Sequence, residues 1–174
     1  NYDNFEGTCY TDTYVGRMVK LTPKTRFCGK IHEYLEPLPT SILKVSAYVH
    51  HYGYVYKNDE ERQAHLMRNL TLEEEAVREN PKDIRMCCQL VQEYLAGRMF
   101  DKAVELAKAT FETTEYEITN SFVQYLLLIV PRIIVGQKEY EKAIEEYNRV
   151  EKEYRLLHQS KLSLYYERAR TYGY

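Results

Sequence analysis

The sequence predicts a mainly α-helical protein that is α+β overall, because a short antiparallel β segment precedes the helices. From Asp59 onward, apolar residues recur every three or four positions, which is the spacing of amphipathic helices. Before Asp59, apolar and polar residues alternate in short segments that proline and glycine interrupt, which is typical of strands and turns. We therefore expect two domains: residues 1–57 with strands and loops, and residues 58–174 with antiparallel helices.

The composition argues against several functional classes. The 24 basic and 26 acidic residues leave a net charge of −2, which argues against non-specific binding of nucleic acid or of a membrane surface. The longest apolar run, residues 125–135, is too short to span a bilayer and contains Pro131. The four cysteines form no Cys-x-x-Cys pair, and Cys87 and Cys88 suit a helix interior better than a disulfide. We therefore expect a reducing, cytoplasmic compartment.

Three strands are expected in the first domain. Residues 14–21 alternate weakly and are rich in strand-forming residues, residues 22–24 form a turn, and residues 25–32 complete an antiparallel hairpin. Residues 42–50 alternate well and give a third strand. Residues 1–13 are polar and turn-like and lack an initial Met, so we expect the chain to be a fragment of a longer protein.

The first helix is expected to begin at Asp59. Asp59 is a suitable N-cap, without a capping box because Arg62 rather than Glu follows three positions later. Asn80 and Pro81 end this helix. Its predicted apolar face consists of Leu66, Met67, Leu70 and Val77.

The next two helices are also amphipathic. Gly97 is expected to end the second helix, and Asp101 can cap the third. Their predicted apolar faces are Ile84, Cys87, Cys88, Val91 and Leu95 in the second helix, and Ala103, Leu106, Ala107 and Thr110 in the third.

Three further helices complete the chain. Residues 118–135 are strongly apolar, so this helix is expected to be buried on more than one side, with Gly136 at its end. Two amphipathic helices follow it. Their predicted apolar faces are Tyr140, Ala143, Ile144, Tyr147, Val150 and Tyr154, and then Leu162, Tyr165, Ala169 and Tyr172.

Two segments of the helical domain are similar to each other. Residues 97–106 and 136–146 each follow a helix and contain an aromatic residue, an acidic residue, Lys and Ala in succession. These residues resemble the tetratricopeptide (TPR) repeat, in which a small residue lies where two helices cross and an aromatic residue precedes it by three positions. The matching pairs are Ala103 with Phe100, and Ala143 with Tyr140.

The phase of the repeat agrees with this resemblance. Pro81 matches the proline that ends a TPR repeat, and counting from it places Tyr94, Leu90 and Ala103 where the family has residues of these kinds. The two alanines are 40 residues apart instead of about 34, so the second repeat is degenerate or contains an insertion. The resemblance implies a TPR-like antiparallel array of about two and a half repeats.

The candidate site lies in two segments, residues 26–37 and 47–54, which hold three of the five histidines. His32 and Glu33 end a predicted strand, where an imidazole can bind a divalent ion and the neighbouring carboxylate can orient it. A half-exposed surface histidine is the commoner outcome for such a position. His50 and His51 would point to opposite faces of a strand, so only one of them can face a pocket shared with His32.

The same two segments resemble family 2 glycosyltransferases of the A-type fold that carry a C-terminal TPR extension. The resemblance covers roughly residues 14–109. Gly-Lys-Ile-His-Glu at residues 29–33, followed by His-Tyr-Gly-Tyr at residues 51–54, is fairly specific as a pair, whereas either alone is weak. The other matching residues are Arg17, Lys57, Arg68, Asn69 and Leu70.

This resemblance implies a longer protein that binds a nucleotide-sugar donor. In that protein, Mn²⁺ or Mg²⁺ held by an Asp-x-Asp motif would neutralise the diphosphate leaving group. His32 would complete the metal or diphosphate site, and Glu33 would be a catalytic carboxylate that positions it or the acceptor. Because the nucleotide-binding half and the Asp-x-Asp are missing here, we expect this chain to be inactive and to use no cofactor by itself. The residues expected to line the pocket or contact the acceptor are His50, His51, Tyr52 and Tyr54.

Two other functions remain open. A stand-alone TPR-type scaffold would bind a peptide in its groove without needing His32, and the strands before the helices argue against it. A small metal hydrolase would use His32, Glu33 and His50 or His51, but the chain shows no pattern of residues that would orient these ligands. As partners we expect a protein or peptide acceptor, and a homodimer formed through an unpaired strand edge.

Overall fold

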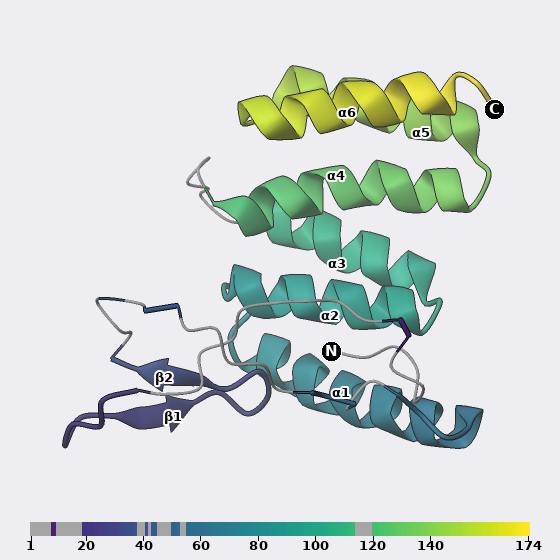
Figure 1. The fold of residues 1–174 in the computed structure, drawn as a ribbon. Helices are drawn as coiled ribbons and strands as arrows, with labels where there is room; N and C mark the ends of the chain where they lie inside the picture. The colour runs from purple at the N-terminus through teal and green to yellow at the C-terminus, as the bar shows by residue number, and fades with distance from the viewer. Residues whose placement is uncertain are drawn as a thin grey trace. The chain divides into compact units, whose positions relative to one another are not determined.

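The computed structural model describes residues 8–9, 19–37, 41, 43–44, 50–52, 55–113 and 120–174. In these residues the protein is mainly helical, with a short two-stranded antiparallel sheet before the helices, as the sequence predicts (Figure 1). The strands are β1 (Arg26–Cys28) and β2 (Tyr34–Glu36). The helices are α1 (Asp59–Glu79), α2 (Ile84–Ala96), α3 (Phe100–Thr113), α4 (Ser121–Gly136), α5 (Tyr140–Glu153) and α6 (His158–Thr171).

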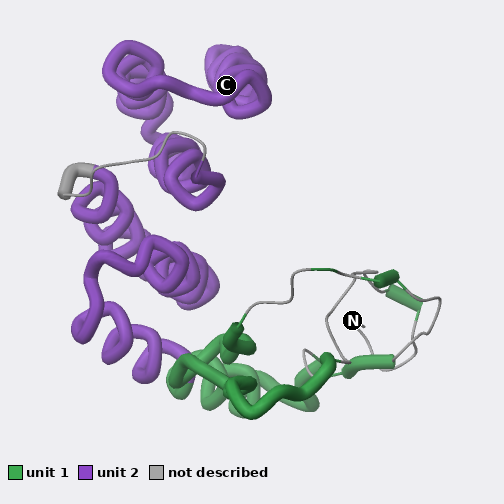
Figure 2. Tube along the Cα trace, turned by 90° about the vertical axis from the view of Figure 1, so that its left-hand side faces the viewer, with its two compact units in different colours: residues 1–68 green, residues 69–174 purple. Residues whose placement is uncertain are grey.

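The chain forms two compact units, Asn1–Arg68 and Asn69–Tyr174, coloured green and purple in Figure 2. The division falls inside α1, so the second unit consists of the end of α1 and the helices α2 to α6. The domain boundary predicted between residues 57 and 58 stays a prediction.

The structure contains an antiparallel hairpin, but β1 pairs with a different strand from the one predicted. Residues 25–32 contain β1 as expected, but β1 pairs with β2, with Phe27 opposite Leu35. The described part of the predicted first strand, residues 19–21, is not a strand, and residues 14–18 lie outside the described residues. The reason is local: Gly29 and His32 have φ values of 99° and 53°, which turn the chain back immediately after Cys28.

The predicted third strand falls mostly outside the described residues. Leu43, Lys44 and His50 are described and are not in a strand, while residues 42 and 45–49 lie outside. The sheet that the structure describes therefore contains β1 and β2.

The start of α1 is capped by Asn58 rather than by Asp59, so the predicted cap was wrong by one residue. The Asn58 side chain accepts a hydrogen bond from the Glu61 backbone N–H at 2.8 Å. The Glu61 carboxylate in turn accepts one from the Lys57 N–H at 2.8 Å, which gives a reciprocal arrangement close to a capping box. Of the predicted apolar face, Leu66 and Leu70 are buried, whereas Met67 is exposed.

The turns after α2 and α4 share one geometry. The N–H of Met99 bonds to the Tyr94 carbonyl and that of Arg98 to the Leu95 carbonyl, which is a Schellman motif with Arg98 at φ 57°. Lys138, at φ 66°, occupies the same place after α4. The predicted terminators Gly97 and Gly136 therefore precede the left-handed residue instead of occupying it.

The cap predicted for α3 was wrong. Asp101 does not cap α3, because α3 already begins at Phe100 and Asp101 lies in its first turn. There its negative charge interacts favourably with the positive end of the helix dipole. Pro131 lies within α4, is buried, and does not interrupt the helix.

The 40-residue spacing of the two similar segments has a simple origin. The connection from α3 to α4 is three residues longer than that from α1 to α2, and α4 is three residues longer than α2. These six residues account for the excess over a repeat of about 34 residues.

The helices of the second unit stack in chain order, as Figure 1 shows for α2 to α6. Each of them packs on the next, and in addition α2 contacts α4 and α4 contacts α6. This pattern requires a core on both sides of α4, as its apolar sequence predicts. Among the described residues, the apolar ones with no exposed surface are Val91, Ala103, Ala107, Leu126, Val130, Ala143, Val150 and Leu164.

The predicted apolar face of α6 was wrong. Leu162, Tyr165 and Tyr172 are 55%, 38% and 67% exposed, and Ala169 is exposed as well. The helix instead buries Leu164 and Thr171, because α4 and α5 lie on that side of it. The buried side of α6 also carries Ser160, Ser163 and Glu167, which are half-buried, so it is the less apolar side and the apolar spacing pointed to the other one.

Candidate functional site

The His-Glu segment lies in the tight loop between β1 and β2. Gly29 enters this loop at φ 99°, and an added Cβ there would meet the Ile31 carbonyl oxygen at 3.2 Å. Ile31 is buried, His32 is half-buried in a left-handed conformation, and Glu33 is exposed. A non-glycine residue at positive φ costs about 1–2 kcal/mol, so the hairpin holds His32 in a strained position next to an exposed carboxylate.

An ion pair joins β1 and β2 at the end of the hairpin that lies away from the loop. Arg26 and Glu36 are directly opposite each other, and the Arg26 Nη2 lies 2.5 Å from a Glu36 carboxylate oxygen. The hydrogen bond from Arg26 lowers the pKa of Glu36. Hydrogen bonding to Cys28, and then to Glu36, raises the pKa of Arg26. Because the pair is exposed, it contributes little to stability, and its main effect is to fix the register.

The second predicted segment is described only in part. His50, His51 and Tyr52 are exposed, and Tyr54 lies outside the described residues. Among the described residues, no group of three or more His, Cys, Asp or Glu side chains is close enough to hold a metal ion. The roles assigned to His32, Glu33, His50, His51, Tyr52 and Tyr54 therefore stay predictions.

The residues predicted for repeat packing lie in the interior or at the turns of the second unit. Ala103 and Ala143 are fully buried at equivalent places near the starts of α3 and α5. Tyr94 is buried and donates a hydrogen bond from its hydroxyl to Glu74 at 2.8 Å. Phe100 is 37% exposed, and Tyr140 stacks on Tyr174 with ring centroids 5.3 Å apart.

The structure brings together residues on α2, α4 and α6 that the sequence analysis did not single out. We call this set, Gln92, Tyr125, Arg132 and Ser163, the inner ridge. A hydrogen bond joins Gln92 to Tyr125, and Arg132 donates to the Ser163 hydroxyl at 2.9 Å. Burial raises the pKa of Tyr125, which places its phenol in a partly desolvated position.

Arg132 connects the inner ridge to Glu167 on α6. Its Nη2 lies 3.8 Å from a carboxylate oxygen of Glu167, and its side chain is 35% exposed. One sequence signal could have found it: Arg132 is the one charged residue in the otherwise apolar segment 121–136. A lone charge in such a helix must reach a polar partner or solvent.

A second charged cluster joins α3 and α5 and is fully paired. Arg149 donates two hydrogen bonds to Glu146, at 2.6 and 3.0 Å, and Glu146 is 8% exposed. The Arg149 guanidinium also lies 5.8 Å from the ring centroids of Phe111 and Tyr154. The hydrogen bonds to Glu146 raise the pKa of Arg149, so Arg149 stays charged, and its contacts with the two rings pack α3 against the end of α5.

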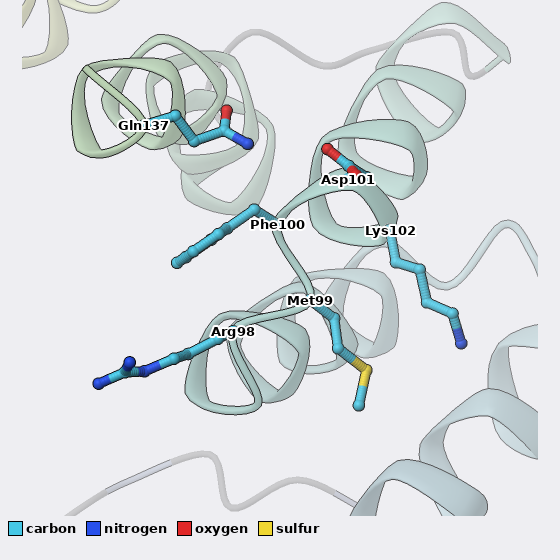
Figure 3. Close-up of a pocket in the computed structure, with 6 residues that line it drawn as sticks. All are labelled: Arg98, Met99, Phe100, Asp101, Lys102 and Gln137. Atoms are coloured by element: carbon cyan, nitrogen blue, oxygen red, sulfur yellow. The ribbon is translucent and has the colours of Figure 1, made fainter. Parts of the chain in front are cut away.

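The turn between α2 and α3 borders an open hollow of about 250 Å³ (Figure 3). Figure 3 shows the side chains of Arg98 and Phe100 extending to one side of the turn, and those of Met99 and Lys102 to the other. The remaining lining residues are Asp101 and Gln137. None of the six is buried, so the hollow lacks the enclosed apolar walls of a small-molecule site.

Comparison with known proteins found no family model and no curated protein that matches the chain. None of the helices that the structure describes has the length and apolar content that crossing a membrane requires.

Proposed function

We propose that the second unit is a protein-interaction domain that binds an extended acidic peptide on the face of α2, α4 and α6. The observation that supports this is the inner ridge, which runs across α2, α4 and α6, where α4 contacts both of the other helices. Tyr125 offers a flat amphipathic surface, while Gln92 and Ser163 offer hydrogen bonds to a peptide backbone. Arg132 adds a partly exposed positive charge, and Arg85 lies two turns before Gln92 on α2.

The test is peptide binding to the 174-residue chain, measured by fluorescence anisotropy with matched libraries of acidic and basic peptides. We expect acidic peptides to bind, and Tyr125→Ala or Arg132→Gln to weaken them at least about tenfold, as for a central interface residue. Lys142→Gln on α5, whose side chain is 63% exposed, is the matched control and should change nothing. Equal binding by the wild type and both ridge variants would refute the proposal.

A second candidate is that the chain is the C-terminal part of a nucleotide-sugar-dependent glycosyltransferase. The strained His32 beside Glu33 favours it, because such backbone strain concentrates at functional sites. In this proposal the longer protein binds the nucleotide-sugar donor with Mn²⁺ or Mg²⁺, and the helices recruit the acceptor. We also place the protein in the cytoplasm, a proposal that the free thiols of Cys87 and Cys88 support.

The coding DNA upstream of Asn1 tests the transferase proposal. An open frame that encodes one further domain with an Asp-x-Asp would support it, and His32→Ala in that longer protein should then weaken metal or donor binding. A start codon directly before Asn1 would refute the transferase proposal and leave peptide binding by the second unit as the proposed function. Sugar transfer by the purified 174-residue chain would contradict the expectation that this chain alone is inactive.

A further inference from the structure

Arg132 uses few of the hydrogen-bond donors that its guanidinium offers. A guanidinium has five N–H donors, yet among the described residues Arg132 makes one hydrogen bond, to the neutral Ser163 hydroxyl at 2.9 Å. Its Nε–H is buried and has no hydrogen-bond partner in the part of the chain that the structure describes. Arg132 is therefore a partly exposed cation that no described carboxylate holds by a hydrogen bond.

Two arginines of the neighbouring helices α5 and α6 are paired more completely. Arg149 donates three hydrogen bonds to carboxylates of α5, at 2.6–3.0 Å. Arg168 donates one hydrogen bond to Glu151 and one to Asn148, both at 2.7 Å. Arg132 differs from both because most of its donors remain for a carboxylate that the described residues do not supply.

Glu167 lies near Arg132 without forming a hydrogen bond to it. One of its carboxylate oxygens is 3.8 Å from Nη2 of Arg132, which is beyond hydrogen-bond distance. The other oxygen is 3.9 Å from Nη1 of Arg170, on the same helix as Glu167. The carboxylate therefore lies between a cation of α4 and a cation of α6, and a shift of about 1 Å towards either would form a charge-assisted hydrogen bond.

These three charged groups interact in a partly buried environment. Burial, and then the negative charge of Glu167, raises the pKa of Tyr147 to about 12, while the charges of Arg132 and Arg170 act in the opposite direction. Charges that interact beside a packed helix layer are screened less than charges in open solvent. The charge of Glu167 therefore affects any carboxylate that approaches Arg132.

We propose that Glu167 regulates the inner ridge by competing with the carboxylates of the bound peptide for Arg132. This inference rests on the proposed function of the ridge. In the free protein Glu167 partly neutralises Arg132 but leaves most of its donors unused. When an acidic peptide binds, its carboxylate takes these donors and Glu167 shifts towards Arg170. Glu167 therefore lowers the affinity of the ridge for acidic peptides and has no such effect on neutral ones.

The experiment uses the acidic library peptide that binds the wild type most tightly and an analogue with Asn and Gln in place of Asp and Glu. Binding of both to the 174-residue chain is measured by fluorescence anisotropy. We expect Glu167→Gln to raise the affinity for the acidic peptide about three- to fivefold, as for a partly exposed charge pair, and to leave that for the analogue unchanged. Glu167→Ala removes the same charge with a smaller side chain and should give the same gain.

A double variant identifies the group through which Glu167 acts. Arg132→Gln combined with Glu167→Gln should bind the acidic peptide like Arg132→Gln alone, because the gain requires the Arg132 charge. The matched control is Glu145→Gln, at an exposed position of α5, which changes the net charge equally and should bind like the wild type.

The possible failures can be distinguished from one another. Unchanged affinity in both Glu167 variants, with Arg132→Gln still weakening the acidic peptide, would overturn this inference and leave the proposed function in place. A gain that persists in the Arg132→Gln background would overturn it as well. If acidic peptides bind neither the wild type nor Glu167→Gln, the proposed function itself is refuted and this inference with it.

Discussion

Gln124 on α4 accepts a hydrogen bond from the backbone N–H of Leu157 at 3.0 Å. Its side-chain nitrogen reaches the carbonyl of Arg155 at 3.4 Å, so one buried amide spans the connection between α5 and α6. Leu157 is the N-cap residue of α6 and makes no side-chain cap of its own. The orientation of α6 on the array therefore depends on a residue more than thirty positions earlier in the chain.

We expect Gln124→Met to lower the free energy of unfolding by about 2–3 kcal/mol. The substitution keeps the side-chain volume but leaves backbone groups of the α5–α6 connection without their partner, and such groups are costly when desolvated. Urea unfolding followed by circular dichroism measures the change. Gln63→Met, at an exposed position of α1, is the matched control and should stay within about 0.5 kcal/mol of the wild type. A loss below about 1 kcal/mol at Gln124 would show that the amide is dispensable.

The left-handed residues Arg98 and Lys138 should be improved by glycine. Each of Arg98→Gly and Lys138→Gly is expected to raise the free energy of unfolding by roughly 0.5–1 kcal/mol, because relief of the positive φ exceeds the entropic cost of glycine. Glu105→Gly, at an exposed position inside α3, is the control and should lower it by about 1 kcal/mol. Destabilisation by both turn variants would contradict the Schellman geometry.

The hydroxyl of Tyr147 is buried and has no hydrogen-bond partner among the described residues. Removing an unsatisfied hydroxyl relieves its desolvation, so Tyr147→Phe should be neutral or stabilise the protein by up to about 1 kcal/mol. Tyr94→Phe is the matched control, because the Tyr94 hydroxyl bonds to Glu74 at 2.8 Å, and it should destabilise by about 1 kcal/mol. Thermal unfolding of both variants decides the point. If Tyr147→Phe costs as much as Tyr94→Phe, then its hydroxyl has a partner in solution.

The buried thiol of Cys88 should make the protein less stable in alkali. Burial raises the pKa of Cys88 from 9.0 to about 12, so above pH 9 the unfolded state loses this proton while the folded state keeps it. The unfolded state then binds fewer protons, and stability falls with rising pH by up to about 2 kcal/mol near pH 10.5. Urea unfolding between pH 7 and pH 10.5 should show a smaller fall for Cys88→Ala than for the wild type. Cys9→Ala, at an exposed position, should show the same fall as the wild type.

Local patterns predicted most of the helical part of the fold. The Asn80-Pro81 break and the paired alanines Ala103 and Ala143 depend on neighbours within a few turns, and they lie where expected. The spacing of apolar residues predicted where the helices lie, but it was wrong about Met67 in α1 and about the buried side of α6. Cap positions were predicted less accurately, because Asn58 and Asp59 are both good N-cap residues and only the helix geometry selects between them.

The candidate site was predicted less completely. The sequence placed His32 and Glu33 at the end of a strand, whereas they lie in the loop between β1 and β2, because the left-handed Gly29 ends the strand early. It did not single out Tyr125 or Arg132, because their importance arises from α2 and α6, which are distant in the chain. Partners separated by thirty or more residues leave no periodic signal.

The sequence by itself determined the fold class, the existence of the six helices in the described residues and the burial of the two repeat alanines, since helix formation and amphipathicity are short-range properties. The tertiary structure decided the partner of β1, the left-handed positions after α2 and α4, and the side of α6 that is buried. On α6 the more apolar side is the exposed one, and only the placement of α4 and α5 against Leu164 leaves Leu162, Tyr166 and Tyr172 facing solvent.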